Sequence, residues 1–172
     1  MQRLILILSF IILLGGCDTG PTNQSVSTLP TEVYFSPDGR IQDRIIKAIN
    51  LSKSTINIAI YDFTNGIIAQ SLKEAKDGGV KIRIIMDKTK AGNKDSEYKF
   101  FKDNGFEVKL MSGKGHGIMH HKFIIFDGKL LMTGSYNISE NAEKYSYENV
   151  LFISDIKVIE QYQAEFEKMR MF

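Results

Sequence analysis

Two apolar patterns alternate along the chain from about residue 32 onward. Short runs rich in β-branched and aromatic residues predict strands at 33–35, 54–61, 80–86, 106–111 and 149–154. Between them, apolar residues recur at helical spacing and predict helices at 41–53, 67–77, 96–104 and 156–169. Strands that alternate with helices indicate an α/β domain, in which helices sandwich a central sheet.

One apolar run carries polar residues at both of its ends. The segment HHKFIIFDGKLLMTGSYN, residues 120–137, predicts a β-hairpin that turns at Asp127-Gly128 and gives the sheet a mixed character. A two-residue turn there sets Lys122 opposite Thr133 and His120 opposite Ser135. Since side chains alternate between the two faces of a strand, we expect these four on one face.

This polar group suits a phosphate diester. The ammonium of Lys122, the hydroxyl of Ser135 and the carboxamide of Asn137 can donate to a tetrahedral oxyanion, and a neutral imidazole at His120 can attack or shuttle protons. Gly134 is expected to leave room for a ligand to approach the backbone.

The spacing of these residues resembles a known motif. His120-x-Lys122-x4-Asp127, followed by Gly134-Ser135-x-Asn137, is similar to the HKD motif of the phospholipase D superfamily. The stretches VYFSPDG, SKSTINIAIYDFT and SYEN resemble the small single-motif bacterial endonucleases of that superfamily and the mitochondrial members related to them. The resemblance covers the domain from Val33 onward and implies a phospholipase D/nuclease-like fold.

The resemblance also implies roles for individual residues. His120 is the expected nucleophile, which forms a phosphohistidine that water then resolves, while Lys122, Ser135 and Asn137 hold the phosphate oxygens. Glu148 matches the acidic residue that orients the histidine. Neither a metal nor another cofactor is required by this route.

Asp127 is the motif aspartate and is assigned to the site with the others. An aspartate at the first position of an Asp-Gly turn is also explained by turn chemistry alone, so both readings stay open for this residue.

This chemistry needs two histidines, one to attack and one to protonate the leaving oxygen. The chain carries a single HKD-like motif. The small members of the superfamily pair two motifs across a two-fold axis, and the resemblance therefore implies a homodimer that shares one active site.

The leading functional prediction is a non-specific endonuclease acting on DNA or RNA. The formal net charge is only +2, so any contact with a polyanion must come from a local basic patch. The candidates are Lys88, Lys90 and Lys94, which lie in one loop. The alternative is that these lysines are simply solvated. A phospholipase acting on membrane lipids and a non-catalytic phosphate-binding protein are the other two hypotheses.

The N-terminus predicts export. Residues 1–16 combine an early arginine, an apolar run too short to span a bilayer and a small pair before Cys17, and they resemble the signal peptide and lipobox of bacterial lipoproteins. We expect lipidation at Cys17, a flexible tether at 17–31 and the catalytic domain at 32–172; ordinary cleavage or an uncleaved anchor is the alternative. A membrane-tethered location outside the cytoplasm follows from the first reading.

Overall fold

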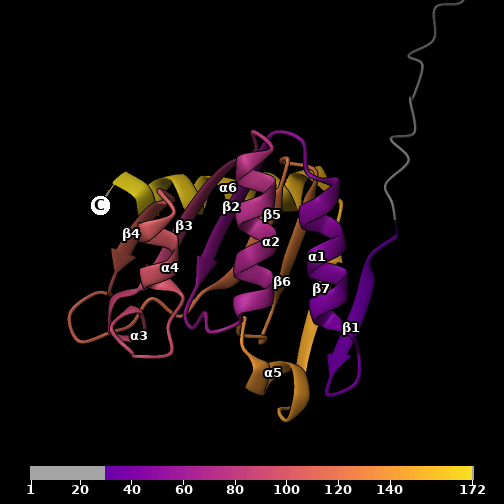
Figure 1. The fold of residues 1–172 in the computed structure, drawn as a ribbon. Helices are drawn as coiled ribbons and strands as arrows, with labels where there is room; N and C mark the ends of the chain where they lie inside the picture. The colour runs from indigo at the N-terminus through magenta and orange to yellow at the C-terminus, as the bar shows by residue number, and fades with distance from the viewer. Residues whose placement is uncertain (1–29, 172) are drawn as a thin grey trace, which may run out of the picture.

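The computed structural model describes residues 30–171, which form one seven-stranded sheet with helices on both faces (Figure 1). The strands are β1 (Glu32–Ser36), β2 (Thr55–Ile60), β3 (Lys81–Asp87), β4 (Glu107–Met111), β5 (Lys122–Phe126), β6 (Leu130–Gly134) and β7 (Glu148–Ile153). The helices are α1 (Ile41–Leu51), α2 (Gly66–Asp77), α3 (Lys88–Ala91), α4 (Tyr98–Asp103), α5 (Glu140–Lys144) and α6 (Ile156–Met171). The predicted signal peptide, Cys17 and most of the predicted tether lie outside the described residues.

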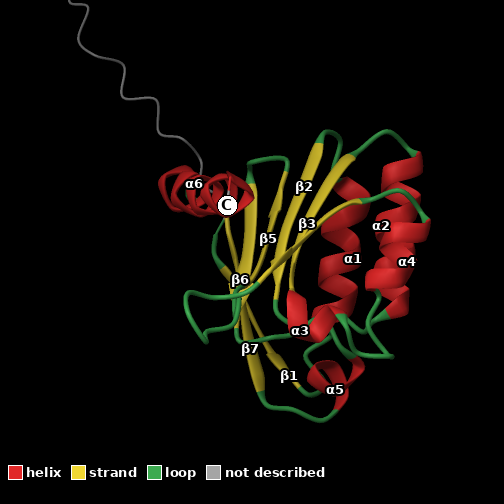
Figure 2. Cartoon of the chain, turned by 90° about the vertical axis from the view of Figure 1, so that its left-hand side faces the viewer, coloured by secondary structure: helices red, strands yellow, loops and turns green. Residues whose placement is uncertain are grey.

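The sheet is mixed, and its strand order is β1-β7-β6-β5-β2-β3-β4. The pairs β2–β3 and β3–β4 are parallel, whereas β2–β5, β5–β6, β6–β7 and β1–β7 are antiparallel. Figure 2 shows α1, α2 and α4 on one side of the sheet and α6 on the other. The predicted α/β sandwich with a mixed sheet is confirmed.

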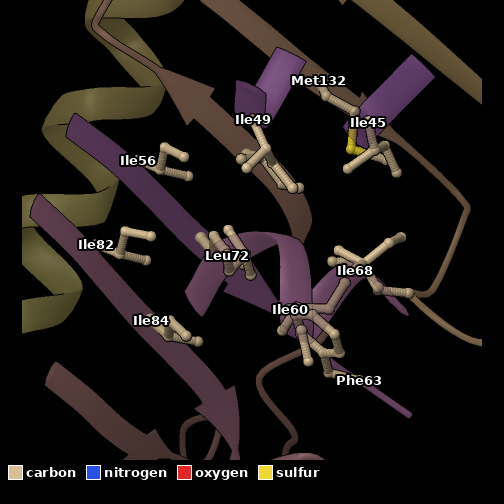
Figure 3. Packing of buried hydrophobic residues seen from close by; sticks show 14 of the residues in the cluster. Ile45, Ile49, Ile56, Ile60, Phe63, Ile68, Leu72, Ile82, Ile84 and Met132 are labelled. Carbon is tan, nitrogen blue, oxygen red and sulfur yellow. The ribbon is translucent and has the colours of Figure 1, made fainter. Parts of the chain in front are cut away.

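The larger hydrophobic cluster lies between the sheet and α1, α2 and α4 (Figure 3). Ile45 and Ile49 of α1 are fully buried against it, as is Leu72 of α2. Residues Ile56–Ile60 of β2 are buried throughout, because this central strand is covered on both faces. The continuous apolar sequence of β2 therefore reflects its central position in the sheet.

A smaller cluster lies under α6 on the opposite face. Phe123 of β5, Leu131 of β6 and Phe166 of α6 are its largest buried members. The rings of Phe123 and Phe166 meet edge to face with their centroids 6.4 Å apart. The alternation of β5 between these two clusters fixes which of its side chains face which helix layer.

The register predicted for the hairpin is wrong by one residue. The turn has three residues, Asp127–Lys129, and the amide of Lys129 donates to the Phe126 carbonyl at 2.9 Å. Phe123 consequently lies opposite Thr133. The cause lies outside the hairpin, because the Asp127 amide donates to the Thr55 carbonyl at 2.8 Å and so extends the ladder with β2. Thr133 therefore does not share a face with Lys122.

The expectation for Gly134 is also wrong. A Cβ atom at this position would lie 2.0 Å from the carbonyl oxygen of Asn149 in β7. The space beside Gly134 is therefore filled by the neighbouring strand, and the glycine is required by the close pairing of β6 with β7 rather than by a ligand.

Two short helices occupy segments that the sequence predicted as loops. Helix α3 follows β3 directly, and the Asp87 carboxylate caps it by accepting from the amides of Thr89 and Lys90, each at 3.0 Å. Helix α5 is capped by Ser139, whose hydroxyl accepts from the Ala142 amide at 3.1 Å. Both helices lie at the lower end of the sheet in Figure 1, next to the site described below.

Candidate active site

The candidate site lies at one end of the sheet, among the termini of its central strands. Strands β2, β3 and β6 end at this end of the sheet, and β5 and β7 begin there, because the sheet combines parallel and antiparallel pairs. Residues that are far apart in the sequence are thereby brought together. The loops that follow β2 and β6 are joined by a bridge between Phe63 and Ile138.

His120 and Lys122 form the centre of the site. The Lys122 Nζ atom lies 3.3 Å from Nε2 and 3.4 Å from Nδ1 of His120, and it donates to the His120 carbonyl at 3.2 Å. His120 is exposed, whereas Lys122 is half-buried. The first residue of β5 thus holds a cation against an imidazole that a substrate can reach.

Tyr61, at the end of β2, organises this pair and was not singled out from the sequence. Its ring meets the His120 ring edge to face at 4.4 Å between centroids. The ammonium groups of Lys122 and Lys90 lie 5.2 and 5.1 Å from the centroid of the same ring. One aromatic ring therefore contacts both cations and the imidazole. The position of Tyr61 at the carboxyl end of a predicted strand was the available signal.

Lys90 belongs to the site, and the other two basic-loop lysines do not contact it. Lys90 is half-buried and forms an ion pair with Asp62 at 3.4 Å. Lys88 and Lys94 are exposed, and within the described part of the chain neither ammonium group forms a hydrogen bond or an ion pair. The loop therefore offers one organised cation and two solvated ones at this end of the molecule.

Asp87, which the sequence analysis also missed, fixes the segment that leads into His120. It is 1% exposed, and its Oδ2 atom accepts from the Met119 amide at 3.0 Å while Oδ1 caps α3. A single buried carboxylate thus ties together β3, α3 and the residue that precedes His120. The end of a β-branched strand was again the only sequence signal.

Ser135 and Glu148 are in direct contact. The Ser135 hydroxyl donates to the Glu148 carboxylate and accepts from the Asn149 amide at 3.1 Å. Glu148 also acts on Lys122, because its negative charge opposes the lowering of the lysine pKa that burial causes. The structure therefore brings Glu148 close to the centre of the site, although the contact it makes is with Ser135 and not with His120.

Asn137 and Asp62 each carry a buried oxygen without a partner. Within residues 30–171, the Oδ1 atoms of these two side chains have no hydrogen bond. Their loops are adjacent, since the Ile138 amide donates to the Asp62 carbonyl at 3.2 Å. Buried polar atoms of this kind are uncommon and mark positions where a polar ligand gains most from binding.

Burial and charge lower the pKa of His120. Partial burial is the largest cause, the Lys122 ammonium adds to it, and Asp87 opposes it. The pKa of Lys122 is also lowered, by burial, while Glu148 and Asp62 oppose that effect. A lowered pKa keeps the imidazole neutral, which is the form that can attack phosphorus.

Asp127 lies away from this group, at the opposite end of β5. Its carboxylate accepts from the amides of Lys53, Ser54 and Thr55 at 2.8–2.9 Å and from the Ser54 hydroxyl at 2.8 Å. Partial burial acts to raise the pKa of Asp127. The hydrogen bonds that its carboxylate accepts, of which the one from the Thr55 amide has the largest effect, outweigh burial and lower the pKa to about 2. We therefore correct its assignment to the site: it anchors the hairpin tip to the start of β2.

Two tyrosines and a second histidine close to the motif in the sequence lie in different surroundings. Tyr136 is fully buried in the core, and its hydroxyl donates to Glu143 at 2.8 Å. Tyr147 is 93% exposed and remains available to a ligand. His121 is exposed and meets the Phe123 ring, which belongs to the α6 face, with the centroids 5.5 Å apart.

Residues 30–171 contain neither a cluster of metal-binding side chains nor a helix that could span a membrane. No group of three or more histidine, cysteine, aspartate or glutamate side chains is arranged to hold a metal ion. None of the helices in this part of the chain has both the length and the apolar character needed to cross a membrane.

The comparisons with known proteins agree with the site. A family model described as "Cardiolipin synthase, PLD-like domain" matches residues 45–170. The mitochondrial cardiolipin hydrolase of Chlamydomonas reinhardtii is 34% identical over 126 residues, which cover 73% of this chain and 56% of that protein. The phospholipase D of Rickettsia prowazekii is 31% identical over 128 residues, which cover 74% of this chain and 62% of that protein. The matches thus span less than two thirds of these relatives.

Two solved structures match over nearly their whole length. NucT from Helicobacter pylori has a TM-score of 0.75 and 28% identity, with 83% of this chain and 96% of that chain covered. Nuc from Salmonella typhimurium, described as a phospholipase D family member, has a TM-score of 0.75 and 26% identity, with 81% and 93% covered. The family model, the relatives and the histidine–lysine pair agree, and the chain belongs to the phospholipase D superfamily.

Proposed function

We propose that this domain is a phosphodiester hydrolase that cleaves nucleic acid through a phosphohistidine formed on His120. The observation that carries the proposal is the contact between His120 and Lys122, with the lysine Nζ atom 3.3 Å from Nε2. The cation lowers the histidine pKa and stands where it can stabilise the charge that develops on a phosphoryl group.

The reaction proceeds in two displacements. The neutral imidazole attacks phosphorus, the bond from phosphorus to the leaving oxygen breaks, and that oxygen takes a proton from a second histidine. Water then attacks the phosphohistidine, gives a proton back to the second histidine and releases the phosphate monoester. Lys122 and Lys90, whose ammonium groups contact the same Tyr61 ring, are the cations beside this chemistry.

We infer that the second histidine is His120 of another copy of the chain. The other two histidines of the sequence, His116 and His121, do not share the environment of His120, because His116 lies in the exposed loop at 113–117 and His121 packs on the α6 face. An isologous homodimer supplies a second, equivalent imidazole with no additional sequence.

A nucleic acid is the preferred substrate. The two small solved relatives are covered almost completely, as expected for a single domain of the endonuclease type that the sequence resembles. Lys88 and Lys94 are exposed at the same end of the molecule as Lys90, and they can follow a polyanionic backbone.

The test is incubation of the purified domain with DNA, RNA and phospholipid vesicles in EDTA, with His120→Ala as the control. Cleavage of nucleic acid by the wild type alone supports the proposal, and release of phosphatidic acid alone overturns it.

Phospholipid is the second candidate substrate. It is favoured by the names of the relatives, a phospholipase D and a mitochondrial cardiolipin hydrolase. The surface next to His120 gives it less support, because a lipid substrate favours exposed apolar side chains there, and of the two apolar residues before His120 Ile118 is 47% exposed whereas Met119 is only 4% exposed. The same incubation distinguishes the two substrates.

We also propose that the domain acts outside the cytoplasm on a lipid tether. This rests on the lipobox-like sequence that ends at Cys17. Metabolic labelling with palmitate in wild type and Cys17→Ser cells tests it, and equal labelling of the two proteins would contradict it.

A further inference from the structure

A pocket of about 350 Å³ lies at the end of the sheet opposite His120. Helix α1 supplies Ala48 and Leu51, and the hairpin supplies Phe126 and Leu130, so that the pocket has an apolar floor. Its volume is in the range of ligand-binding pockets. Seven residue steps along an extended strand separate His120 from Asp127, which places this pocket about 23 Å from the catalytic histidine. It is therefore not part of the site described above.

The rim of the pocket is basic. Lys47 and Lys129 line it, and within residues 30–171 neither ammonium group forms an ion pair or a hydrogen bond. Arg44 also lines the pocket but is neutralised by Glu32, whose carboxylate it contacts at 2.6 Å and whose pKa falls to about 2 through this bond. Lys47 and Lys129 thus remain above the apolar floor, together with the Asp127 carboxylate, which also lines the pocket and is held by the backbone amides of residues 53–55.

We propose that this pocket binds an anionic phospholipid of the membrane surface, with the phosphate between Lys47 and Lys129 and the first carbons of an acyl chain against Leu51. Leu51 is 63% exposed and therefore offers the acyl chain an apolar surface to cover. Paired lysines beside apolar surface match both parts of such a lipid.

The place where the chain enters the fold agrees with this assignment. Pro30 lines the same pocket, so the segment that leads back to Cys17 departs from its edge. Thirteen residue steps reach at most about 45 Å. A domain held this way presents the pocket to the membrane and turns His120 toward the opposite side. The bound lipid is a docking ligand and does not react.

Vesicle sedimentation tests the proposal on a protein that starts at Pro30, which removes the predicted anchor. All seven strands, six helices and both hydrophobic clusters of the described chain lie within it. Vesicles of phosphatidylcholine with about one third phosphatidylglycerol should bind the wild type, and K47E/K129E should lower the affinity about tenfold or more, since each lysine contributes roughly 1 kcal/mol at an anionic surface. The matched variant K88E/K94E carries the same change in net charge at the other end and should bind within about twofold of wild type.

If K47E/K129E and K88E/K94E lost vesicle affinity equally, binding would depend on net charge alone, and the proposed lipid site would be overturned. So would failure of the wild type to bind. A second measurement uses amide chemical shifts with monomeric dihexanoyl phosphatidylglycerol, which should perturb Ala48, Leu51 and Leu130. Glycerol 3-phosphate has no acyl chains and should bind at least several-fold more weakly; equal binding would exclude a lipid site. Nuclease activity in solution is measured in parallel and should be unchanged in K47E/K129E, so this proposal and the proposed function fail independently.

Discussion

The Lys122 ammonium lies within 3.4 Å of both ring nitrogens of His120. A positive charge at this distance disfavours the imidazolium form, and burial of the pair acts in the same direction. The contact therefore has two consequences, since it keeps the expected nucleophile neutral and leaves a cation beside the atom that reacts.

Lys122→Met should raise the pKa of His120 toward its ordinary value of 6.5. The reason is the loss of the neighbouring positive charge, while partial burial of the ring, which is the larger cause of the lowered pKa, remains, so the pKa recovers only in part. NMR titration of the His120 ring protons measures the shift, and Lys88→Met, an exposed lysine at the same end, is the control that should leave it unchanged. In the wild type the acid limb of kcat/KM should accordingly lie below pH 6.5. A His120 pKa that does not rise in Lys122→Met would contradict this account.

Tyr61→Leu should lower phosphodiester cleavage about tenfold, while Tyr61→Phe keeps most of it. The ring contacts Lys90, Lys122 and His120, and a cation–π contact of this kind is worth about 1–2 kcal/mol, which Phe retains. Steady-state kinetics should place the loss in kcat, and NMR should show a changed His120 pKa in the Leu variant only. If Phe and Leu variants lose activity equally, the hydroxyl and not the ring is responsible.

Asp127→Asn should destabilise the fold by about 2 kcal/mol and leave the catalytic constants nearly unchanged, because it weakens charge-assisted hydrogen bonds at the hairpin tip. Urea unfolding measures the loss. The pKa of Asp127 is lowered in the folded state, so its contribution is complete above the unfolded value of 3.8 and disappears as the pH falls toward about 2. The variant should therefore lose less stability than wild type across that range.

Asp103→Asn is the matched control for this experiment. Asp103 is exposed and pairs only with Lys99, so its loss should cost less than about 0.5 kcal/mol. An Asp127→Asn protein that is stable yet inactive would return this aspartate to the catalytic group.

Gly134→Ala should lower the free energy of unfolding by roughly 3 kcal/mol, since the new methyl group would collide with the Asn149 carbonyl and force β6 from β7. Denaturant titration measures it. Gly66→Ala is the control, because there a Cβ atom meets only the flexible Glu97 carboxylate at 3.3 Å. A stable Gly134→Ala protein with lost substrate binding would instead revive the ligand interpretation of this glycine.

Mixed dimers test the shared active site. When wild type and His120→Ala chains are refolded together in varying ratios, activity should follow the square of the wild-type fraction, because only dimers with two histidines react. The measurement is EDTA-resistant cleavage at constant total protein. A linear dependence is the result expected of independent monomers and would overturn the proposed homodimer.

The local sequence determined most of the architecture. The continuous apolar run of β2 identifies a strand that is buried on both faces. The helical spacing of Ile41, Ile45 and Ile49 identifies α1 and its buried face. Neither prediction needs information about distant residues. The motif spacing likewise identified His120 and Lys122, because Lys122 begins β5 and His120 lies two residues before it, so that local backbone alone brings them together.

Tertiary structure decided what depends on residues from other strands. The turn length of the hairpin is set by the pairing of Asp127 with Thr55, a partner 72 residues away, and this moved Thr133 to the opposite face. Tyr61 and Asp87 enter the site because β2 and β3 end at the end of the sheet where β5 begins. A short stretch of sequence does not reveal that these strands are neighbours. Local periodicity encodes which face of a single helix or strand is buried. The order and register of the strands arise instead from hydrogen bonds between distant segments. The sequence therefore predicted the helix and sheet layers and the motif, but not Tyr61 and Asp87 around His120.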